Sequence, residues 1–153
     1  MAVTLTTESP LQDEIRDLVA ELDAHLSTLA PPEANYFLSV EEMAAPDTKV
    51  WVARDGGIAV ACGALKRHTM RIGEVKRMYT RPDWQGRGIA RRVLGEIVNA
   101  AIADGLEELV LETGDRHPAA WAIYEKAGFV RCGPVLDYPD SEYSVFYHKQ
   151  LAA

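Results

Sequence analysis

The chain has 153 residues, of which 48% are hydrophobic and 25% charged, and these are the proportions of a globular protein. They argue against a disordered chain, a collagen-like repeat and a coiled coil, and we expect one domain over residues 1–153 with its own core. No apolar run approaches the roughly 20 residues that span a bilayer, so no membrane partner is expected.

The net charge of −7 is distributed unevenly along the chain. Residues 1–50 carry 10 acidic and 2 basic side chains, residues 51–100 carry 4 and 10, and residues 101–153 carry 9 and 4. Nonspecific nucleic-acid binding requires a broad basic surface, so no nucleic-acid partner is expected. A basic segment in an acidic protein suits a compact polyanion such as the phosphates of a cofactor, although a solvated helix face has the same composition.

Two cysteines, Cys62 and Cys132, lie in apolar surroundings without Cys or His at metal-ligand spacing, so no metal site is expected. We interpret them as reduced core residues, with a reactive thiol as the alternative. The N-terminus also lacks the early basic residues of a secretory signal. Both observations favour a cytoplasmic protein.

The N-terminal part is predicted to contain a short strand and a helix. Residues 3–6 favour a strand, and residues 10–29 place leucines and an isoleucine at three- and four-residue spacing, as an amphipathic helix does. Ser9 is the expected N-cap, with Pro10 at the first helical position and Gln12 completing a capping box.

The middle of the chain is predicted to begin with a short helix and a hairpin. Ser39 and Glu42 suggest the short helix. Strands over residues 49–54 and 58–65 flank an Asp-Gly-Gly turn at residues 55–57.

A third strand over residues 73–80 leads through a loop into a strongly periodic helix that Gly105 ends. Residues 109–113 then read as a buried strand, and His117-Pro118 opens another helix that runs to about Ala127. Two final strands, residues 129–132 and 143–149, close the chain. The mixed order of helices and strands predicts an α/β (α+β) fold.

The segment with the clearest chemistry reads Gln85-Gly86-Arg87-Gly88-Ile89-Ala90 and lies between a strand and a helix. Glycines let backbone N–H groups approach a ligand, and a helix start adds unpaired N–H groups and a positive dipole end, worth roughly 0.3–1 kcal/mol per anionic contact. The Walker and dinucleotide-binding patterns do not fit the chain. An anion site is the functional interpretation, and a tight turn before a helix is the alternative.

This segment resembles motif A of the GNAT superfamily of acyl-CoA-dependent N-acetyltransferases, whose pattern [QR]-x-x-G-x-[GA] is matched by Gln85, Gly88 and Ala90. About 35 residues later, residues 120–129 read A-W-A-I-Y-E-K-A-G-F and resemble motif B. The resemblance covers residues 49–150. It implies a GNAT fold, which is a mixed, strongly twisted sheet with helices on both faces.

The resemblance implies acetyl-CoA as co-substrate. Backbone N–H groups of the motif A segment would hold its pyrophosphate, and the preceding strand would pair with the pantetheine arm and polarise the thioester carbonyl. The cofactor-binding residues implied in this way are Met78, Tyr79, Thr80, Gln85, Gly86, Arg87, Gly88, Ile89 and Ala90. Arg87, Arg91 and Arg92 could add phosphate contacts, although the last two could equally be solvated.

Two catalytic roles follow from the resemblance. Tyr124 would stand beside the sulfur and protonate the leaving thiolate; the alternative is a ring packed in the core. Glu74 is the candidate base, since some GNAT enzymes carry a glutamate in this strand, and a salt bridge with Lys76 is its alternative. Strand alternation is expected to place Glu74, Lys76 and Met78 on one face. His25 and His68 are weaker candidates, and a partly buried structural role is expected for His25.

One position departs from the family pattern. Many relatives have Asn three positions before the motif B alanine, where this chain has His117. His117 could replace the Asn contact to the cofactor, cap the helix that starts at Pro118, or face the substrate.

The resemblance implies transfer of acetyl from acetyl-CoA to a primary amine of a small molecule. A protein lysine or N-terminus as acceptor, and a non-catalytic acyl-CoA-binding module, are the alternatives. The acidic N-terminal helices could favour a cationic acceptor, but the same acidity is ordinary for solubility. A homodimer is left open, and the residues do not identify the acceptor.

Overall fold

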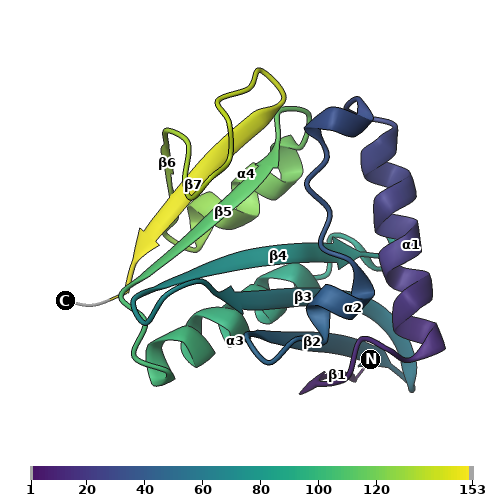
Figure 1. Ribbon diagram of the computed structural model, residues 1–153. Coiled ribbons are helices and arrows are strands. Elements are labelled where there is room, and N and C mark those ends of the chain that lie inside the picture. Colours follow the sequence, from purple (N-terminus) through teal and green to yellow (C-terminus); the bar gives the residue numbers. More distant parts are fainter. Residues whose placement is uncertain (1, 152–153) are drawn as a thin grey trace.

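The computed structural model describes residues 2–151, and a seven-stranded sheet forms its centre (Figure 1). The strand order is β1-β2-β3-β4-β5-β7-β6, and every neighbouring pair is antiparallel except β4 and β5. The strands are β1 (Val3–Thr7), β2 (Thr48–Asp55), β3 (Ile58–Arg67), β4 (Ile72–Thr80), β5 (Glu108–Gly114), β6 (Val130–Cys132) and β7 (Ser144–Gln150). The predicted strands are therefore all present, with bounds that shift by one or two residues.

In the described part of the chain, four α-helices cover the sheet: α1 (Asp13–Ser27), α2 (Val40–Met43), α3 (Ile89–Ala103) and α4 (Pro118–Lys126). Short 3₁₀ turns occupy Pro32–Ala34 and Pro82–Trp84. Among residues 2–151, no helix has the length and apolar character that crossing a membrane requires.

The two faces of the sheet bury separate cores, and β2 shows how one strand serves both. Its residues Trp51 and Ala53 pack in the core beneath α3 and α4, whereas Val50 and Val52 pack with α1 and α2. Successive side chains of a strand point to opposite faces, which produces this division. Helices on both faces of a mixed sheet confirm the predicted fold class.

The start of α1 differs from the prediction. The helix begins at Asp13, its N-cap residue is Gln12, and no side chain caps it. Ser9 Oγ instead accepts from the N–H of Leu11, and the Gln12 amide donates to the Ser9 carbonyl. These local bonds close a turn before the helix, so the predicted capping box was wrong.

The second predicted helix is confirmed by its cap. Ser39 Oγ accepts from the N–H of Glu42 at 3.1 Å, and the Ser39 N–H donates to the Glu42 carboxylate at 3.0 Å. This reciprocal pair is the capping box of α2. The core expectation for the cysteines holds only for Cys62, because Cys132 is half-buried on β6, at the edge of the sheet.

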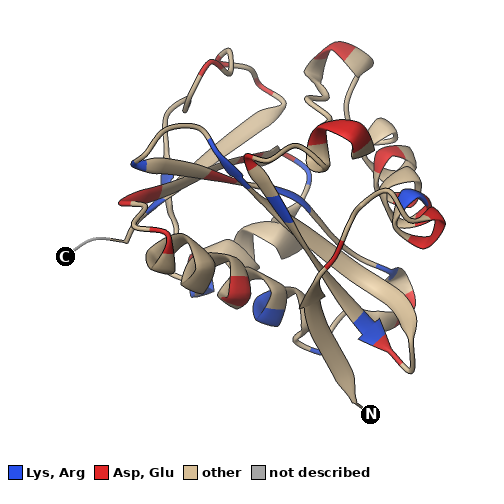
Figure 2. Cartoon of the chain, turned by 60° about the horizontal axis from the view of Figure 1, so that its bottom comes forward, with Lys and Arg blue, Asp and Glu red and all other residues tan. Residues whose placement is uncertain are grey.

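The charge asymmetry of the sequence largely reflects the docking of the N-terminal region on the sheet. Acidic residues gather on α1 and α2, as the red segments of Figure 2 show. Ion pairs connect Glu8 with Arg54 at 2.7 Å and Glu21 with Arg81 at 2.9 Å, and Asp23 pairs with Arg77. Much of the basic character of β2 to β4 is thus neutralised within the protein.

The parallel pair β4 and β5 separates along its length. Only three residue pairs form, from Ile72 with Glu108 to Glu74 with Val110. Beyond them the strands diverge, as Figure 1 shows. Within residues 2–151, the later part of β4 therefore has a strand partner on the β3 side and none on the β5 side.

A β-bulge in β4 changes which side chains share a face. Cys62 of β3 pairs with Tyr79, but Ala64 pairs with Lys76, so β4 contains one extra residue, and Arg77 has φ +57°. Met78 consequently packs against the core under α3, while Lys76 lies on the other face and donates to Glu74. The expected common face of Glu74, Lys76 and Met78 is wrong for Met78.

Candidate active site

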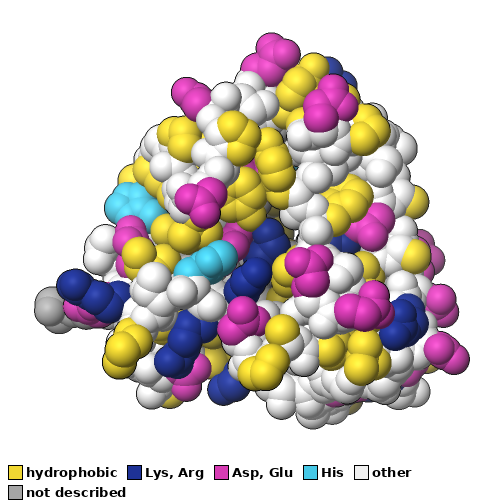
Figure 3. All heavy atoms as spheres, in the orientation of Figure 1, with side chains coloured by type: hydrophobic (Ala, Val, Ile, Leu, Met, Phe, Trp, Pro, Cys, Tyr) yellow, Lys and Arg dark blue, Asp and Glu magenta, His cyan; other side chains and the backbone are white. Residues whose placement is uncertain are grey.

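A cavity of about 660 Å³ lies where β4 and β5 diverge. Its walls come from both strands, from α1, from the start of α3, from α4, and from the segment after α1. Figure 3 shows it as a hollow with basic side chains at its bottom and a histidine beside it. One end, near residues 84–91, we call the cofactor end; the other, near α1 and residues 34–37, we call the acceptor end.

The cofactor end is built from backbone. Gly86 and Gly88 have φ values of +77° and +78°, and a Cβ added at either would meet no protein atom within 4 Å. Within residues 2–151, no protein acceptor takes the N–H groups of Gly86, Gly88, Ile89 or Ala90. Several donors at a helix start that face open space fit a phosphate group.

Gln85 lies at this end but contributes differently from the expectation. Its N–H donates to the Pro82 carbonyl at 3.2 Å, so the unengaged donors begin only after it. Its side-chain amide donates to the Thr80 carbonyl at 3.1 Å and ties the loop to the end of β4.

The later part of β4 gives the cavity a second strip of backbone. Met78, Tyr79 and Thr80 line it, and among the described residues no strand pairs with their edge on the β5 side. An unpaired strand edge can hydrogen-bond an extended ligand arm by adding it as a further strand. This geometry fits the amide-bearing pantetheine arm that the sequence resemblance implies.

The three arginines near the start of α3 are not equivalent. Arg91 lines the cavity, whereas Arg92 donates to the carbonyl of Val3 at 3.1 Å and thereby holds β1. The side chain of Arg87 is exposed. Arg91 and Arg92 were expected either to contact phosphate or to be solvated. Arg91 faces the cavity, and Arg92 hydrogen-bonds the backbone of β1.

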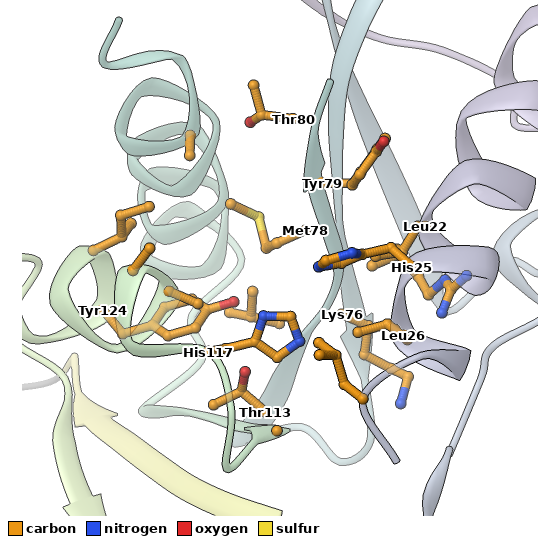
Figure 4. A pocket seen from close by; sticks show the side chains of 18 of the residues that line it. Leu22, His25, Leu26, Lys76, Met78, Tyr79, Thr80, Thr113, His117 and Tyr124 are labelled. Carbon is orange, nitrogen blue, oxygen red and sulfur yellow. The ribbon is translucent and has the colours of Figure 1, made fainter. Parts of the chain in front are cut away.

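Tyr124 lies between the core and the cavity. The residue is only 7% exposed, and its ring packs edge-on against Phe129. Figure 4 shows its hydroxyl pointing into the cavity, and no residue among 2–151 hydrogen-bonds it. Burial, with a smaller effect from Glu112, raises the pKa of Tyr124 above its ordinary value, so the phenol stays protonated.

Glu74 lines the cavity but is almost fully enclosed by partners. Oε1 contacts His68 Nε2 at 2.7 Å, and Oε2 accepts from Lys76 Nζ at 3.3 Å and from the hydroxyl of Tyr138. Lys76 also donates to Tyr138 at 2.7 Å. The salt bridge that was the alternative for Glu74 therefore exists, and both carboxylate oxygens are occupied.

His117 occupies the N-cap position of α4, but its side chain makes no cap hydrogen bond. The ring turns into the cavity, where Figure 4 places it next to Tyr124 and Thr113. It meets the ring of His25 in a T-shaped contact at 5.5 Å. His117 is thus the N-cap residue of α4 without capping it through its side chain. The partly buried position expected for His25 was wrong, because His25 is exposed at the cavity edge.

Glu112 on β5 is a site residue that sequence reasoning missed. It lines the cavity, and one of its oxygens accepts from Ser144 Oγ at 2.8 Å. Burial raises the pKa of Glu112 above the usual range, and the Ser144 hydrogen bond opposes this shift. The available signal was an acidic residue directly after the buried apolar run of β5, where a carboxyl costs free energy unless it has a use.

Comparisons with known proteins agree with this geometry. The family described as Acetyltransferase (GNAT) domain matches residues 46–131. A protein of Azospirillum brasilense named IAA acetyltransferase is 43% identical over 150 residues, which are 97% of this chain and 98% of that protein.

Solved structures extend the likeness. A Klebsiella pneumoniae protein described as an acyl-CoA N-acyltransferase has 29% identity and a TM-score of 0.85, with 97% of each chain covered. The PaiA N-acetyltransferase of Thermoplasma acidophilum, solved with coenzyme A, shares the fold at 16% identity with a TM-score of 0.78, over 98% of this chain and 99% of that one.

Fold and cavity are those of an enzyme that takes an acyl group from coenzyme A. The chain belongs to the GNAT acetyltransferase family and is an acyl-CoA-dependent acetyltransferase.

Proposed function

We propose that this protein transfers the acetyl group of acetyl-CoA to the primary amine of a small molecule. The supporting observation is the shape of the acceptor end. There the rings of Tyr36 and Tyr138 meet at 5.1 Å, and they join the segment after α1 to the loop before β7. An acceptor must therefore reach a bounded cavity, which suits a small molecule better than a folded protein surface.

The acceptor end combines an apolar wall with a few polar groups. Leu22 and Leu26 of α1, together with Phe37, form the wall, and Figure 4 shows the two leucines facing the cavity. Glu112, with one oxygen that no described residue hydrogen-bonds, could hold an ammonium group. An amine with an apolar or aromatic body fits these features.

Acetyl-CoA would bind along the backbone donors of the cofactor end and the free edge of β4. A thioester supplies an activated acetyl group, and the backbone N–H groups there would stabilise the negative charge that develops on its carbonyl oxygen. The Tyr124 hydroxyl, which points into the cavity, would give its proton to the departing sulfur.

Glu74 remains a predicted participant, and its occupied oxygens restrict how it can act. It cannot accept a proton directly without breaking a contact to His68, Lys76 or Tyr138. We propose that Glu74 acts through these partners, holding the Lys76 ammonium and the Tyr138 ring at the acceptor end.

The experiment that tests the function incubates the protein with acetyl-CoA and, separately, 2-phenylethylamine, hexylamine, spermidine and a lysine-containing peptide. Mass spectrometry then measures the acetylated products. We expect the arylalkyl and alkyl amines to be acetylated faster than the peptide. Acetylation of the peptide alone would contradict a small-molecule acceptor.

A further inference from the structure

The ring of His117 is held in the cavity by its surroundings. Gly114 leaves the space that the ring needs, because a Cβ at that position would stand 2.9 Å from His117 Cδ2. On its other side the ring contacts His25. A histidine at the start of a helix normally has water or a backbone group to bind, yet this one is packed between two elements and faces the site.

The Nε2 atom of His117 is buried and has no hydrogen-bond partner among residues 2–151. Leaving a buried polar nitrogen unpaired costs free energy, so such an atom at the wall of a cavity calls for an explanation, and a ligand that bonds it would supply one. With the ring proton on Nδ1, Nε2 offers a lone pair to a donor in the cavity.

The charge state of the ring follows from what surrounds it. Burial and, to a smaller extent, His25 of α1 lower the pKa of His117 below its ordinary value near 6.5, and Asp115 in the preceding loop opposes them. Lys76 of β4, Glu112 of β5 and Tyr124 of α4 line the same cavity. His117 is therefore neutral at pH 7 and able to accept a proton.

The carboxylates of the cavity are less suited to that task. Both oxygens of Glu74 are occupied, and Lys76 Nζ already donates to Glu74 and Tyr138. Glu112 keeps one oxygen bonded to Ser144 and fits best as the anchor of the acceptor ammonium. Among these side chains, His117 is therefore the one that is neutral and has a nitrogen free to accept the proton of the acceptor ammonium.

We propose that His117 is the catalytic base, which accepts through Nε2 the proton that the acceptor ammonium must lose before attack. This inference rests on the proposed function. The amine nitrogen of the acceptor, which has lost one proton to His117, bonds to the acetyl carbon as the C–S bond of the thioester breaks. Tyr124 gives its proton to sulfur and recovers one from the newly bonded nitrogen. The products are the acetylated amine, the thiol of coenzyme A and one proton, which His117 releases to solvent.

The central test variant is His117→Asn, assayed with acetyl-CoA and 2-phenylethylamine. Asparagine keeps an amide that can contact the cofactor, as in many relatives, but it cannot titrate. We expect kcat/KM at pH 7 to fall roughly 10²- to 10⁴-fold, as loss of a general base does. The loss should shrink about tenfold per pH unit as free amine becomes available. The acetyl-CoA dissociation constant from calorimetry should change less than about threefold.

Two further variants sharpen the test. His148→Asn makes the same change at a half-buried histidine that pairs with Glu108 outside the cavity, and it should leave the pH profile unchanged. His25→Asn removes a neighbour that disfavours protonation of His117, so it should move the acidic limb of the profile to higher pH.

Several results would overturn the proposal. Full activity and an unchanged pH profile in His117→Asn would mean that His117 only takes the place of the asparagine that contacts the cofactor in many relatives. A pH-dependent loss in Glu112→Gln, without one in His117→Asn, would assign the proton to Glu112.

If the wild type binds acetyl-CoA but acetylates no amine, the proposed function fails, and the base can still be judged by NMR. The ring signal absent from His117→Asn should titrate below pH 6.5; titration at or above that value would refute the assignment.

Discussion

The two ends of the cavity are made in different ways. The cofactor end and the adjoining free edge of β4 consist of backbone from one stretch of the chain, from Met78 on β4 to Ala90 on α3. The acceptor end consists of side chains from α1, β4, β5, α4 and two loops, which the fold brings together from across the chain (Figure 1).

This difference separates what the family shares from what each member can vary. Backbone donors set by glycines and by a helix start would recognise a phosphate group common to every acyl-CoA, whatever side chains surround them. Side chains such as His117 and Phe37 can change without disturbing the cofactor end. Selectivity for the acceptor should therefore lie in the α1 region and the loops.

The largest effect is expected at the cofactor end, for Gly88→Val. The added side chain would project into the open space in front of the N–H donors, so acetyl-CoA affinity should fall by at least about 100-fold, or about 2.7 kcal/mol. Calorimetry measures this loss.

The matched control for that variant is Gly57→Val in the β2–β3 turn. Gly57 also has a positive φ, +88°, and open space around its Cβ position, but it lies away from the cavity. Both variants should lose about 1–3 kcal/mol of stability from backbone strain, and only Gly88→Val should lose cofactor binding. Equal acetyl-CoA affinity in the two would remove Gly88 from the binding site.

The next effect concerns Tyr124→Phe, which keeps the packed ring and removes the hydroxyl at the junction of the two ends. Turnover should fall roughly 10- to 1000-fold with little change in acetyl-CoA affinity, because the proton is needed when sulfur departs. Steady-state kinetics should be measured where chemistry limits the rate.

Tyr147→Phe is the control for this change. The Tyr147 ring packs beside Tyr124, but its hydroxyl bonds Glu125 and Arg131 and not the cavity. It should lower stability and leave turnover intact. If Tyr124→Phe behaves in the same way, Tyr124 is structural.

The comparison also explains how far the sequence could predict the molecule. Glycine positions and helix periodicity are local, so they indicated the secondary-structure elements and the anion site, and the resemblance of two motifs to the GNAT superfamily indicated the fold. The β-bulge at Arg77 depends on strand pairing and has no local signal in the sequence. The prediction therefore put Met78 on the wrong face of β4. The ring contact of His25 with His117 joins residues 92 positions apart in the chain, and such proximity comes only from the fold.

A smaller effect is expected for Glu74→Gln at the acceptor end. An amide cannot accept all the hydrogen bonds that the carboxylate receives, so stability should fall by about 1–3 kcal/mol. As a positioning residue, Glu74 should change kcat/KM by less than about tenfold, with the pH profile retained. A loss that is large at pH 7 and vanishes at high pH would instead make Glu74 the base.

The last prediction concerns stabilisation of the fold by acetyl-CoA itself, and it tests whether the two ends are independent. A ligand that binds only the folded state at 100 times its dissociation constant adds about 2.7 kcal/mol to the free energy of unfolding. In a domain of this size that raises Tm by several degrees. Hydrogen exchange should slow at the start of α3 and along the free edge of β4, because the ligand would occupy those donors. Exchange in α1 should stay unchanged if the acceptor end needs no cofactor to form. Protection that extends into α1 would mean that cofactor binding also orders the acceptor end, and no shift in Tm together with no binding by calorimetry would refute the cofactor site.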